Sequence, residues 1–215
     1  MDLNADMKKL FTIGYSPHTL ESFISVLKKH QIEVVADVRS VPFSQYNPAF
    51  NCNFFSEALK ENKISYVFLG KECGARISDR NCYRDGRVDY NLVAKSSDFQ
   101  DGLNRIRNGL RKFRIALMCA EKDPITCHRT ILICKNLRDV NFTIQHIMSD
   151  GSLEEQSCSE KRLLRLFGLD QADLFTSRSA QLEEAYDRQA GKIAYKEDQM
   201  KETGILNEDF EDGQI

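Results

Sequence analysis

The sequence predicts an α/β fold: a mainly parallel sheet with helices on both faces, plus a C-terminal helical appendage. Strand-like apolar segments alternate with amphipathic helical segments along the chain, as in parallel sheets joined by crossover helices. The segments 34–38 and 114–120 are almost continuously apolar, which is typical of strands covered on both faces. Hydrophobic residues make up 41% and charged residues 29% of the chain, as expected for a globular protein.

The first predicted strand, at 10–16, contains Gly14 near its end. Ser16 as a cap and Pro17 in the first turn predict a helix whose apolar residues follow at three- and four-residue spacing: Leu20, Phe23, Ile24 and Leu27. Further strands are expected at 34–38, 64–70, 114–120 and 142–148. Further helices are expected at 54–63, 99–113, 125–138, 159–169 and 179–200. The segments 39–51 and 71–90 read as loops, and loops as long as the second are often functional.

We expect three parts: an α/β domain at 8–155, a helical extension at 156–200, and a flexible acidic tail at 201–215. The net charge is −2, but residues 181–215 carry ten acidic and four basic side chains, so residues 1–180 carry +4. A mildly basic body suits an anionic ligand without requiring one. An acidic segment of this kind is usually just a solvated part of the chain, and docking on a partner is the alternative.

Localisation is expected to be cytoplasmic. The N-terminal segment has no signal-peptide pattern, and no apolar run approaches the roughly 18 residues that a membrane span needs. Seven cysteines, an odd number, suggest reduced thiols rather than a disulfide framework. We therefore expect no membrane association.

The segment from Cys119 to Arg129 concentrates the chemically active side chains. Asp123 and Pro124 predict a helix start, and Cys127, His128 and Arg129 would then lie near its electropositive end. Such an end attracts anions and lowers the pKa of a thiol. The alternative is structural: Arg129 pairs with a carboxylate such as Glu121, and both cysteines are packed as small hydrophobic residues.

Spacing argues against two known arrangements. A cysteine-type phosphatase loop needs five residues between cysteine and arginine, whereas nine separate Cys119 from Arg129 and one separates Cys127 from it. Zinc sites usually have cysteines two to four positions apart, and adjacent residues such as Cys127 and His128 rarely bind one ion. We therefore expect no metal site, and nothing in the sequence indicates a cofactor.

A second candidate group follows the strand at 34–38, where Asp37 and Arg39 are expected on the same side. Arg39 could hold an anion with its planar guanidinium, or simply pair with Asp37. The loop 71–90 interleaves five basic residues with two tyrosines, a composition that suits nucleic acid or occurs by chance on exposed loops: Lys71, Arg76, Arg80, Arg84, Arg87, Tyr83 and Tyr90. His146 lies near a predicted strand end and is either a ligand contact or a hydrogen-bonded buried histidine.

The motifs TIGYSPHTLESF, VVADVRSVPFS, CGAR and ALMCAEKDPITCHRTILI resemble the domain of unknown function 488 family over roughly residues 10–155. The resemblance implies an α/β fold with the motifs gathered in one pocket, but no agreed activity. It carries over fifteen positions: Gly14, Ser16, Asp37, Arg39, Pro42, Ser44, Gly70, Gly74, Arg76, Cys119, Glu121, Cys127, His128, Arg129 and His146. One departure is that Lys71, Glu72 and Cys73 separate Gly70 from Gly74, where relatives often have paired glycines.

The leading hypothesis is an enzyme or enzyme-like domain that binds a small anionic or nucleotide-like ligand at the strand carboxyl ends. The candidate catalytic residues are Cys119 and Cys127 as nucleophiles and Glu121 and His128 as acid or base. The candidate ligand-binding residues are Ser16, Asp37, Arg39, Ser44, Arg76, Arg129 and His146. The alternatives are a nucleic-acid-binding module that uses the loop 71–90, and a non-catalytic interaction protein.

Overall fold

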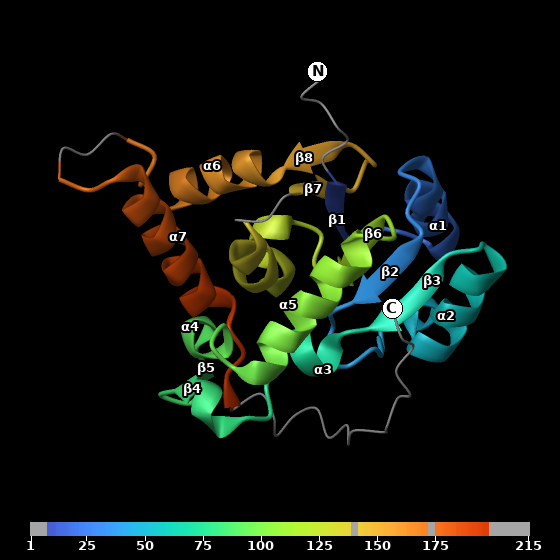
Figure 1. Cartoon of the computed structure of the whole chain (residues 1–215), viewed down its shortest axis with the longest axis horizontal. Helices are drawn as coiled ribbons and strands as arrows, with labels where there is room; N and C mark the ends of the chain where they lie inside the picture. Colours follow the sequence, from blue (N-terminus) through green and yellow to red (C-terminus); the bar gives the residue numbers. More distant parts are fainter. Residues whose placement is uncertain (1–7, 139–141, 172–174, 198–215) are drawn as a thin grey trace.

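Six strands form one sheet in the order β3-β2-β6-β1-β7-β8 (Figure 1). The structure, a computed structural model, describes residues 8–138, 142–171 and 175–197. The strands are β1 Lys8–Gly14, β2 Val34–Asp37, β3 Ser65–Phe68, β6 Ile115–Cys119, β7 Phe142–Ile147 and β8 Leu153–Glu155. All neighbours pair in parallel except β7 and β8. The predicted α/β class with a mainly parallel sheet is confirmed, and β6 lies in the interior of the sheet as expected.

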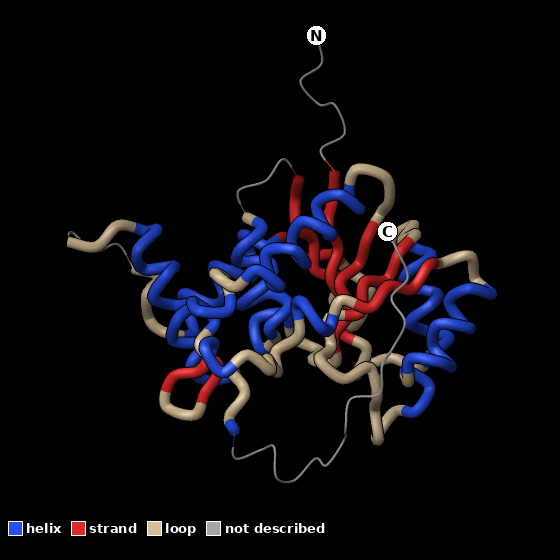
Figure 2. The backbone as a smooth tube through the Cα atoms, turned by 60° about the horizontal axis from the view of Figure 1, so that its bottom comes forward, coloured by secondary structure: helices blue, strands red, loops and turns tan. Residues whose placement is uncertain are grey.

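Seven α-helical segments accompany the sheet within the described residues (Figure 2). They are α1 Leu20–Lys29, α2 Cys52–Glu61, α3 Gly70–Cys73, α4 Tyr90–Val93, α5 Ser97–Leu110, α6 Gln156–Leu166 and α7 Arg178–Ile193. The apolar residues of the longer helices recur at helical spacing and are buried, for example Phe23 and Leu27 in α1. Burial of these faces against the sheet is what stabilises the helices.

Each face of the sheet has its own hydrophobic cluster, because side chains alternate along a strand. Phe11 and Ile13 of β1 lie in the cluster that includes α1 and α2. Leu10 of the same strand lies in the opposite cluster, with residues of α5, α6 and α7. Figure 1 shows α5 across the strands and α1 and α2 at the right. The helices therefore cover both faces, as the sequence predicts.

The helices after residue 155 share the core of the sheet. Leu163 and Leu164 of α6 and Ala185 and Tyr186 of α7 are buried in the same cluster as β6 and α5. A division at residue 155 into domain and extension stays a prediction. The tail expected at 201–215 lies outside the described residues.

Two helix starts differ from the sequence-based expectation. Thr19, not Ser16, caps α1, because its side chain accepts a hydrogen bond from the Ser22 amide. The single helix expected at 125–138 is instead a 3₁₀ turn, a π-helical segment and a second 3₁₀ turn: Pro124–Thr126, Arg129–Cys134 and Lys135–Leu137. Cys127 interrupts the helix, since its backbone is extended (φ −126°, ψ 143°). The predicted Asp123 cap is confirmed, as its carboxylate accepts from the Ile125 amide.

The long segment 71–90 contains more regular structure than expected. It holds part of α3, a short 3₁₀ turn and the hairpin of β4 Tyr83–Arg84 and β5 Arg87–Val88. The two residues of the turn, Asp85 and Gly86, both have positive φ (50° and 68°). Asp-Gly at such a turn is a strong hairpin signal.

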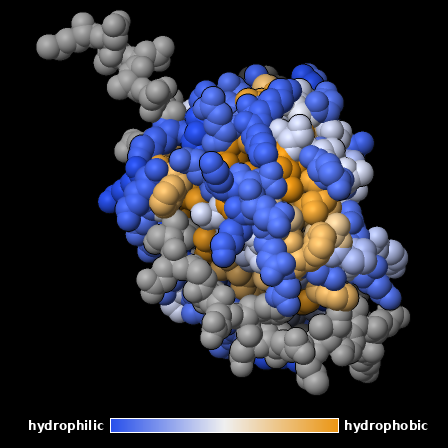
Figure 3. Space-filling model, turned by 90° about the vertical axis from the view of Figure 1, so that its right-hand side faces the viewer, coloured by the Kyte–Doolittle hydropathy of each residue, from blue (hydrophilic) through white to orange (hydrophobic). Residues whose placement is uncertain are grey.

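The described helices include none that is both long enough and apolar enough to cross a membrane. On the side of α1 and α2, hydrophobic atoms show between hydrophilic side chains (Figure 3). Phe54 of α2 is among the exposed large hydrophobic residues, at 57%.

Candidate active site

The carboxyl ends of β1, β2 and β6 meet at one edge of the sheet, where α/β sheets bind their ligands. Pairing of β1 and β6 continues past the strands, because the Tyr15 amide donates to the Cys119 carbonyl oxygen (3.0 Å). Gly14 makes this approach possible, since a Cβ there would lie 1.9 Å from the carbonyl oxygen of Glu121. The chain after β6 therefore lies directly against the end of β1.

A pocket of about 340 Å³ opens at this edge, which we call the strand-end pocket. Its wall combines residues that follow β1, β2 and β6 with residues of the loop after α3. The lining residues are Tyr15, Arg39, Ser40, Val41, Phe43, Ser44, Gln45, Tyr46, Ala75, Arg76, Cys119, Ala120, Glu121 and His128. Six of the eleven predicted site residues line it, and eight lie in or beside it once Asp37 behind Arg39 and Cys127 behind Cys119 are included.

Arg39 is buried in the pocket wall and held from two sides. Its Nε and Nη2 donate to the Asp37 carboxylate, and Nη2 also donates to the Phe50 carbonyl oxygen (2.9 Å). Burial opposes its charge, but Asp37 outweighs this and raises the pKa of Arg39, so the guanidinium stays charged. Within the described part of the chain, its Nη1 is buried without an acceptor. Arg39 therefore pairs with Asp37 and keeps one donor available, and its contact with an anion stays a prediction.

Cys119, Glu121, Cys127 and His128 form the sulfur cluster. Their sulfur, carboxylate oxygen and imidazole nitrogen atoms all lie within 4.8 Å of one another. The Nδ1 of His128 is 3.7 Å from the Cys119 sulfur and 3.8 Å from the Cys127 sulfur. The Cys127 sulfur is 2.8 Å from Oε2 of Glu121, a hydrogen bond. Cys119, Glu121 and His128 line the strand-end pocket, and Cys127 lies behind them.

The tautomer of His128 is fixed by the main chain. Its Nε2 lies 2.9 Å from the carbonyl oxygen of Val38, which can only accept a hydrogen bond, so Nε2 carries a proton. In the neutral ring, Nδ1 is then an unprotonated acceptor that faces both sulfurs. This is the orientation that a base or a metal ligand needs.

The cluster favours negative charge on one sulfur. Burial opposes a charge on Cys127, but the hydrogen bond from Cys119 and the positive charges of Arg129 and His128 lower its pKa well below the ordinary value. The hydrogen bond to Cys127, burial and that negative charge raise the pKa of Cys119 well above it. Burial and the nearby Cys127 also raise the pKa of Glu121. The two thiols therefore share one charge rather than ionise independently.

Arg129 is fully buried and serves as an anchor for the turn. Its Nη1 donates to the carbonyl oxygen of Glu121 (2.7 Å), and its Nε donates to the hydroxyl of Thr12 (3.3 Å). Among the described residues it forms no ion pair with a carboxylate. It lies outside the lining of the strand-end pocket, so the expected direct contact with a ligand stays a prediction.

His146 lies behind Arg129 in a buried network. Thr12 Oγ1 is 2.8 Å from its Nδ1, and its Nε2 is 2.7 Å from Oε1 of Gln156. Gln156 in turn donates to the Tyr186 hydroxyl (2.6 Å). Burial, assisted by the charge of Arg129, lowers the pKa of His146 to about 4. This geometry matches the alternative of a hydrogen-bonded buried histidine.

The remaining predicted residues have different surroundings. Ser16 is exposed and outside the pocket lining. Ser44 is buried in the lining, where its hydroxyl accepts from the Asn47 amide (3.1 Å). Arg76 lies at the mouth, with its guanidinium 5.1 Å from the centre of the Tyr195 ring.

Several other pocket residues were not predicted from the sequence. Tyr15 stacks on Phe50 (4.5 Å between ring centres) and lies 5.1 Å beneath the Arg39 guanidinium. Phe43 is 50% exposed and Tyr46 98% exposed, so they form an apolar rim. The position of Tyr15 directly after Gly14 at a strand end was the available signal.

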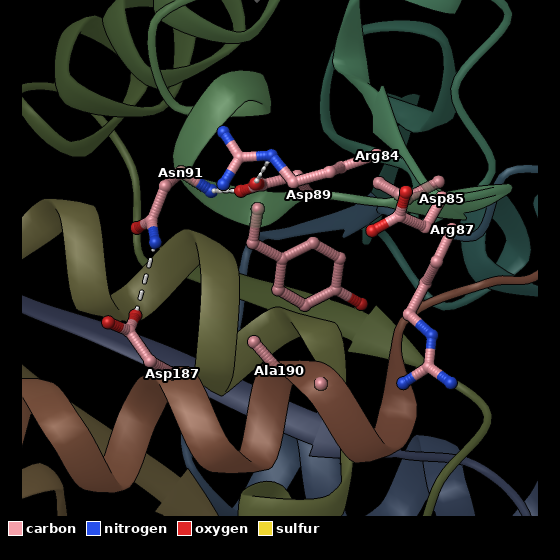
Figure 4. A pocket seen from close by; sticks show the side chains of 10 residues that line it. Arg84, Asp85, Arg87, Asp89, Asn91, Asp187 and Ala190 are labelled. Atoms are coloured by element: carbon pink, nitrogen blue, oxygen red, sulfur yellow. Dashed lines mark hydrogen bonds and ion pairs between the residues drawn. The ribbon is translucent and has the colours of Figure 1, made fainter.

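A second pocket of about 440 Å³, the hairpin pocket, lies between the β4–β5 hairpin and α7 (Figure 4). Its lining includes Arg84 and Arg87 of the loop 71–90. The guanidinium of Arg84 forms an ion pair with the Asp89 carboxylate (3.5 Å). Arg80 of the same loop is paired with Glu197. The alternative of a nucleic-acid surface on this loop stays a prediction.

The sulfur cluster also has the composition of a metal site, which spacing alone argued against. Cys127 and His128 are adjacent, yet both face Cys119, because the extended backbone at Cys127 turns its side chain toward the end of β6. Cysteine, histidine and carboxylate are ligands that zinc accepts.

The profile of a family described as "Domain of unknown function DUF488" matches residues 19–135, more than half of the chain. The protein belongs to this family. The match spans the ends of β2 and β6 and all four residues of the sulfur cluster. Searches of curated proteins and of solved structures find no significant match.

Proposed function

We propose that this protein is an enzyme that acts on a small anionic or nucleotide-like ligand in the strand-end pocket, using cysteine chemistry. The observation that carries the proposal is that a buried arginine donor and a cysteine–histidine pair face the same pocket. Arg39 supplies the donor, and Cys119 and His128 supply the pair.

The ligand-binding end of the pocket suits an anion. Arg39 is positioned by Asp37 and retains Nη1 for a negatively charged oxygen. Arg76 adds a second positive charge at the mouth, and Tyr15 offers an aromatic surface. A volume of about 340 Å³ lies at the small end of the range for small-molecule sites.

The reactive end is Cys119 with His128. The two thiols share one negative charge, which the cluster favours on Cys127. Transfer of the Cys119 proton to Cys127 or to Nδ1 of His128 moves this charge to Cys119, the sulfur that lines the pocket, where the thiolate can attack an electrophilic centre of the ligand. The proton then returns from His128 to the departing group. Cys127 faces the same nitrogen of His128, and Glu121 accepts a hydrogen bond from Cys127, so both set the electrostatic surroundings of His128. The reaction class depends on the ligand.

All seven cysteines are free thiols. This chemistry requires them to stay reduced, which supports the expectation of a reducing compartment such as the cytoplasm.

Thiol reactivity tests the proposal directly. The full chain is treated with reductant and a chelator, then with limiting iodoacetamide near neutral pH, and labelled peptides are counted by mass spectrometry. We expect Cys119 or Cys127 to react faster than a free thiol. Cys158, an exposed cysteine outside the cluster, is the internal comparison. Labelling of Cys158 alone would contradict a thiolate nucleophile.

Ligand binding is tested separately with inorganic phosphate and mononucleotides in thermal-shift measurements. We expect stabilisation that is lost in Arg76→Ala, an exposed position whose change leaves the core intact. Arg84→Ala, in the hairpin pocket, is the matched control and is expected to bind like the unchanged protein.

A further inference from the structure

The four side chains of the sulfur cluster present one ligand atom each toward a common centre. Two sulfurs, one imidazole nitrogen and one carboxylate oxygen lie within 4.8 Å of one another. They come from the end of β6 and from the turn that follows it, so a short, well-anchored stretch of chain supplies all four.

The distances fit tetrahedral coordination. With Zn–S near ~2.3 Å and Zn–N near ~2.0 Å, a sulfur and a nitrogen bound to one ion are about 3.6 Å apart. His128 Nδ1 is 3.7 Å and 3.8 Å from the two sulfurs. The contact of 2.8 Å between Cys127 and Glu121 is a hydrogen bond, and it lengthens when an ion replaces its proton. Glu121 is solvent-exposed and free to make this small movement.

The surroundings of His128 are those of a ligating histidine. A metal-bound imidazole almost always donates its other N–H to a carbonyl or carboxylate group, which fixes the ring. Here Nε2 donates to the Val38 carbonyl oxygen, and Nδ1 is directed at both sulfurs. The carbonyl oxygen of Glu121 is held in turn by Arg129.

Charge balance supports the same conclusion. Two thiolates and one carboxylate carry −3, so a divalent ion leaves −1 on the complex. Arg129, buried directly behind Cys127, supplies the compensating +1 and has no carboxylate partner among the described residues. A buried guanidinium needs such a partner.

We propose that Cys119, Cys127, His128 and Glu121 bind a thiophilic divalent cation of the zinc class, with the ion open to the strand-end pocket. Sulfur and nitrogen ligands select zinc-like ions over magnesium and calcium. Cys119, Glu121 and His128 line the pocket, which gives the ion a route of entry. Glu121 is the exposed ligand and the one that a pocket ligand can displace. Because the two sulfurs already share one negative charge, binding replaces the one remaining thiol proton, which is released to solvent.

This site goes beyond the proposed function. With the ion bound, the thiolates would be ligands rather than nucleophiles, and the ion would polarise a pocket ligand that displaces Glu121 from it. Iodoacetamide labelling of the chelator-treated protein tests the nucleophile, whereas ion binding tests the metal site. Either proposal can fail while the other stands.

The experiment titrates Co²⁺, then Zn²⁺, into the reduced, chelator-treated full chain. We expect one Co²⁺ per chain, with strong tetrahedral absorption bands and a thiolate-to-metal charge-transfer band that Zn²⁺ abolishes. Zn²⁺ is expected to protect Cys119 and Cys127 from iodoacetamide, and a weakly buffered indicator should register proton release.

Cys119→Ser and Cys127→Ser, which nearly preserve side-chain volume, are expected to weaken binding at least 100-fold and to remove the charge-transfer band. Glu121→Gln is expected to weaken it about tenfold without changing the fold, as checked by circular dichroism. Cys158→Ser is the control and should bind like the unchanged protein. Octahedral Co²⁺ spectra, binding well below one ion per chain, or equal loss in Cys158→Ser would each overturn the proposal.

Discussion

The strand-end pocket and the hairpin pocket are both lined by charged residues, but these charges are arranged differently. In the larger hairpin pocket, Arg84 is matched with Asp89, and Asn91 donates to Asp187 (3.2 Å). In the smaller strand-end pocket, a donor of Arg39 is left without an acceptor among the described residues, and two sulfurs share one histidine. The hairpin pocket also has a buried hydroxyl without a partner among the described residues, that of Tyr90. The thiol–imidazole cluster beside a charged guanidinium, rather than volume, therefore distinguishes the candidate active site.

Arg129, which anchors the turn behind the strand-end pocket, gives the largest expected difference in stability between the two pockets. Arg129→Leu removes a fully buried guanidinium and leaves the carbonyl groups of Glu121 and Lys122 without its hydrogen bonds. We expect a loss of about 3–5 kcal/mol in the free energy of unfolding, measured with urea. Arg84→Leu, in the hairpin pocket, is exposed and should cost less than about 1 kcal/mol. Similar losses in both variants would remove the distinction between the pockets.

Two glycines give a second matched pair. Gly14→Ala places a Cβ 1.9 Å from the Glu121 carbonyl oxygen and should destabilise the protein by about 3 kcal/mol. Gly191→Ala, in α7 beside the hairpin pocket, meets nothing within 4 Å and should stabilise it by up to about 1 kcal/mol. Thermal unfolding measures both. A tolerated Gly14→Ala would show that the chain after β6 is free to move away from β1.

The buried network of His146 behind the strand-end pocket should make the free energy of unfolding depend on pH. Its folded pKa of about 4 lies below the ordinary value of 6.5, so the unfolded state binds its proton more readily. This contribution to stability is complete above pH 6.5 and is lost as the pH falls toward 4, by about 3 kcal/mol. Urea unfolding across this range measures the slope. His146→Gln should flatten it, whereas His30→Gln, at a half-buried histidine outside this network, should not.

The smallest expected effect concerns anion recognition. Arg39→Lys keeps a positive charge but loses the planar guanidinium that bonds Asp37 and presents Nη1 to the pocket. Binding of inorganic phosphate or a mononucleotide is expected to weaken about tenfold, or about 1.4 kcal/mol, in calorimetric titration. Arg87→Lys in the hairpin pocket should leave it unchanged. Unaltered binding in Arg39→Lys would place the anion elsewhere.

Much of the fold could be predicted because it depends on local patterns. Continuous apolar segments marked β2 and β6, and helical spacing marked α1, α2 and α5. The antiparallel β8 was missed because three exposed or half-buried residues, Leu153–Glu155, carry no strand pattern of their own. The helix expected at 125–138 was interrupted at Cys127, where tertiary contacts favour an extended backbone over local helix formation.

The sequence indicated which residues meet at the candidate site, but not how they are arranged within it. The rule that parallel strands end at one edge placed Arg39 and Cys119 together. The sequence did not show which of these residues line the pocket. Arg39 and Arg76 line it, whereas Arg129 and His146 are buried behind it. Spacing along the chain argued against a metal site. Spacing does not show which side chains face one another in space.

The sequence by itself determined the α/β class, the sheet edge that carries the site, and the residue types gathered there. These follow from hydrophobic periodicity, strand ends and turn chemistry, which are local properties. Only the tertiary structure decided that Cys127 and His128 both face Cys119, and that one donor of Arg39 stays available. The physical reason is that each depends on contacts across separate strands: His128 is oriented by the Val38 carbonyl after β2, and the turn is held by Arg129 against Thr12 of β1.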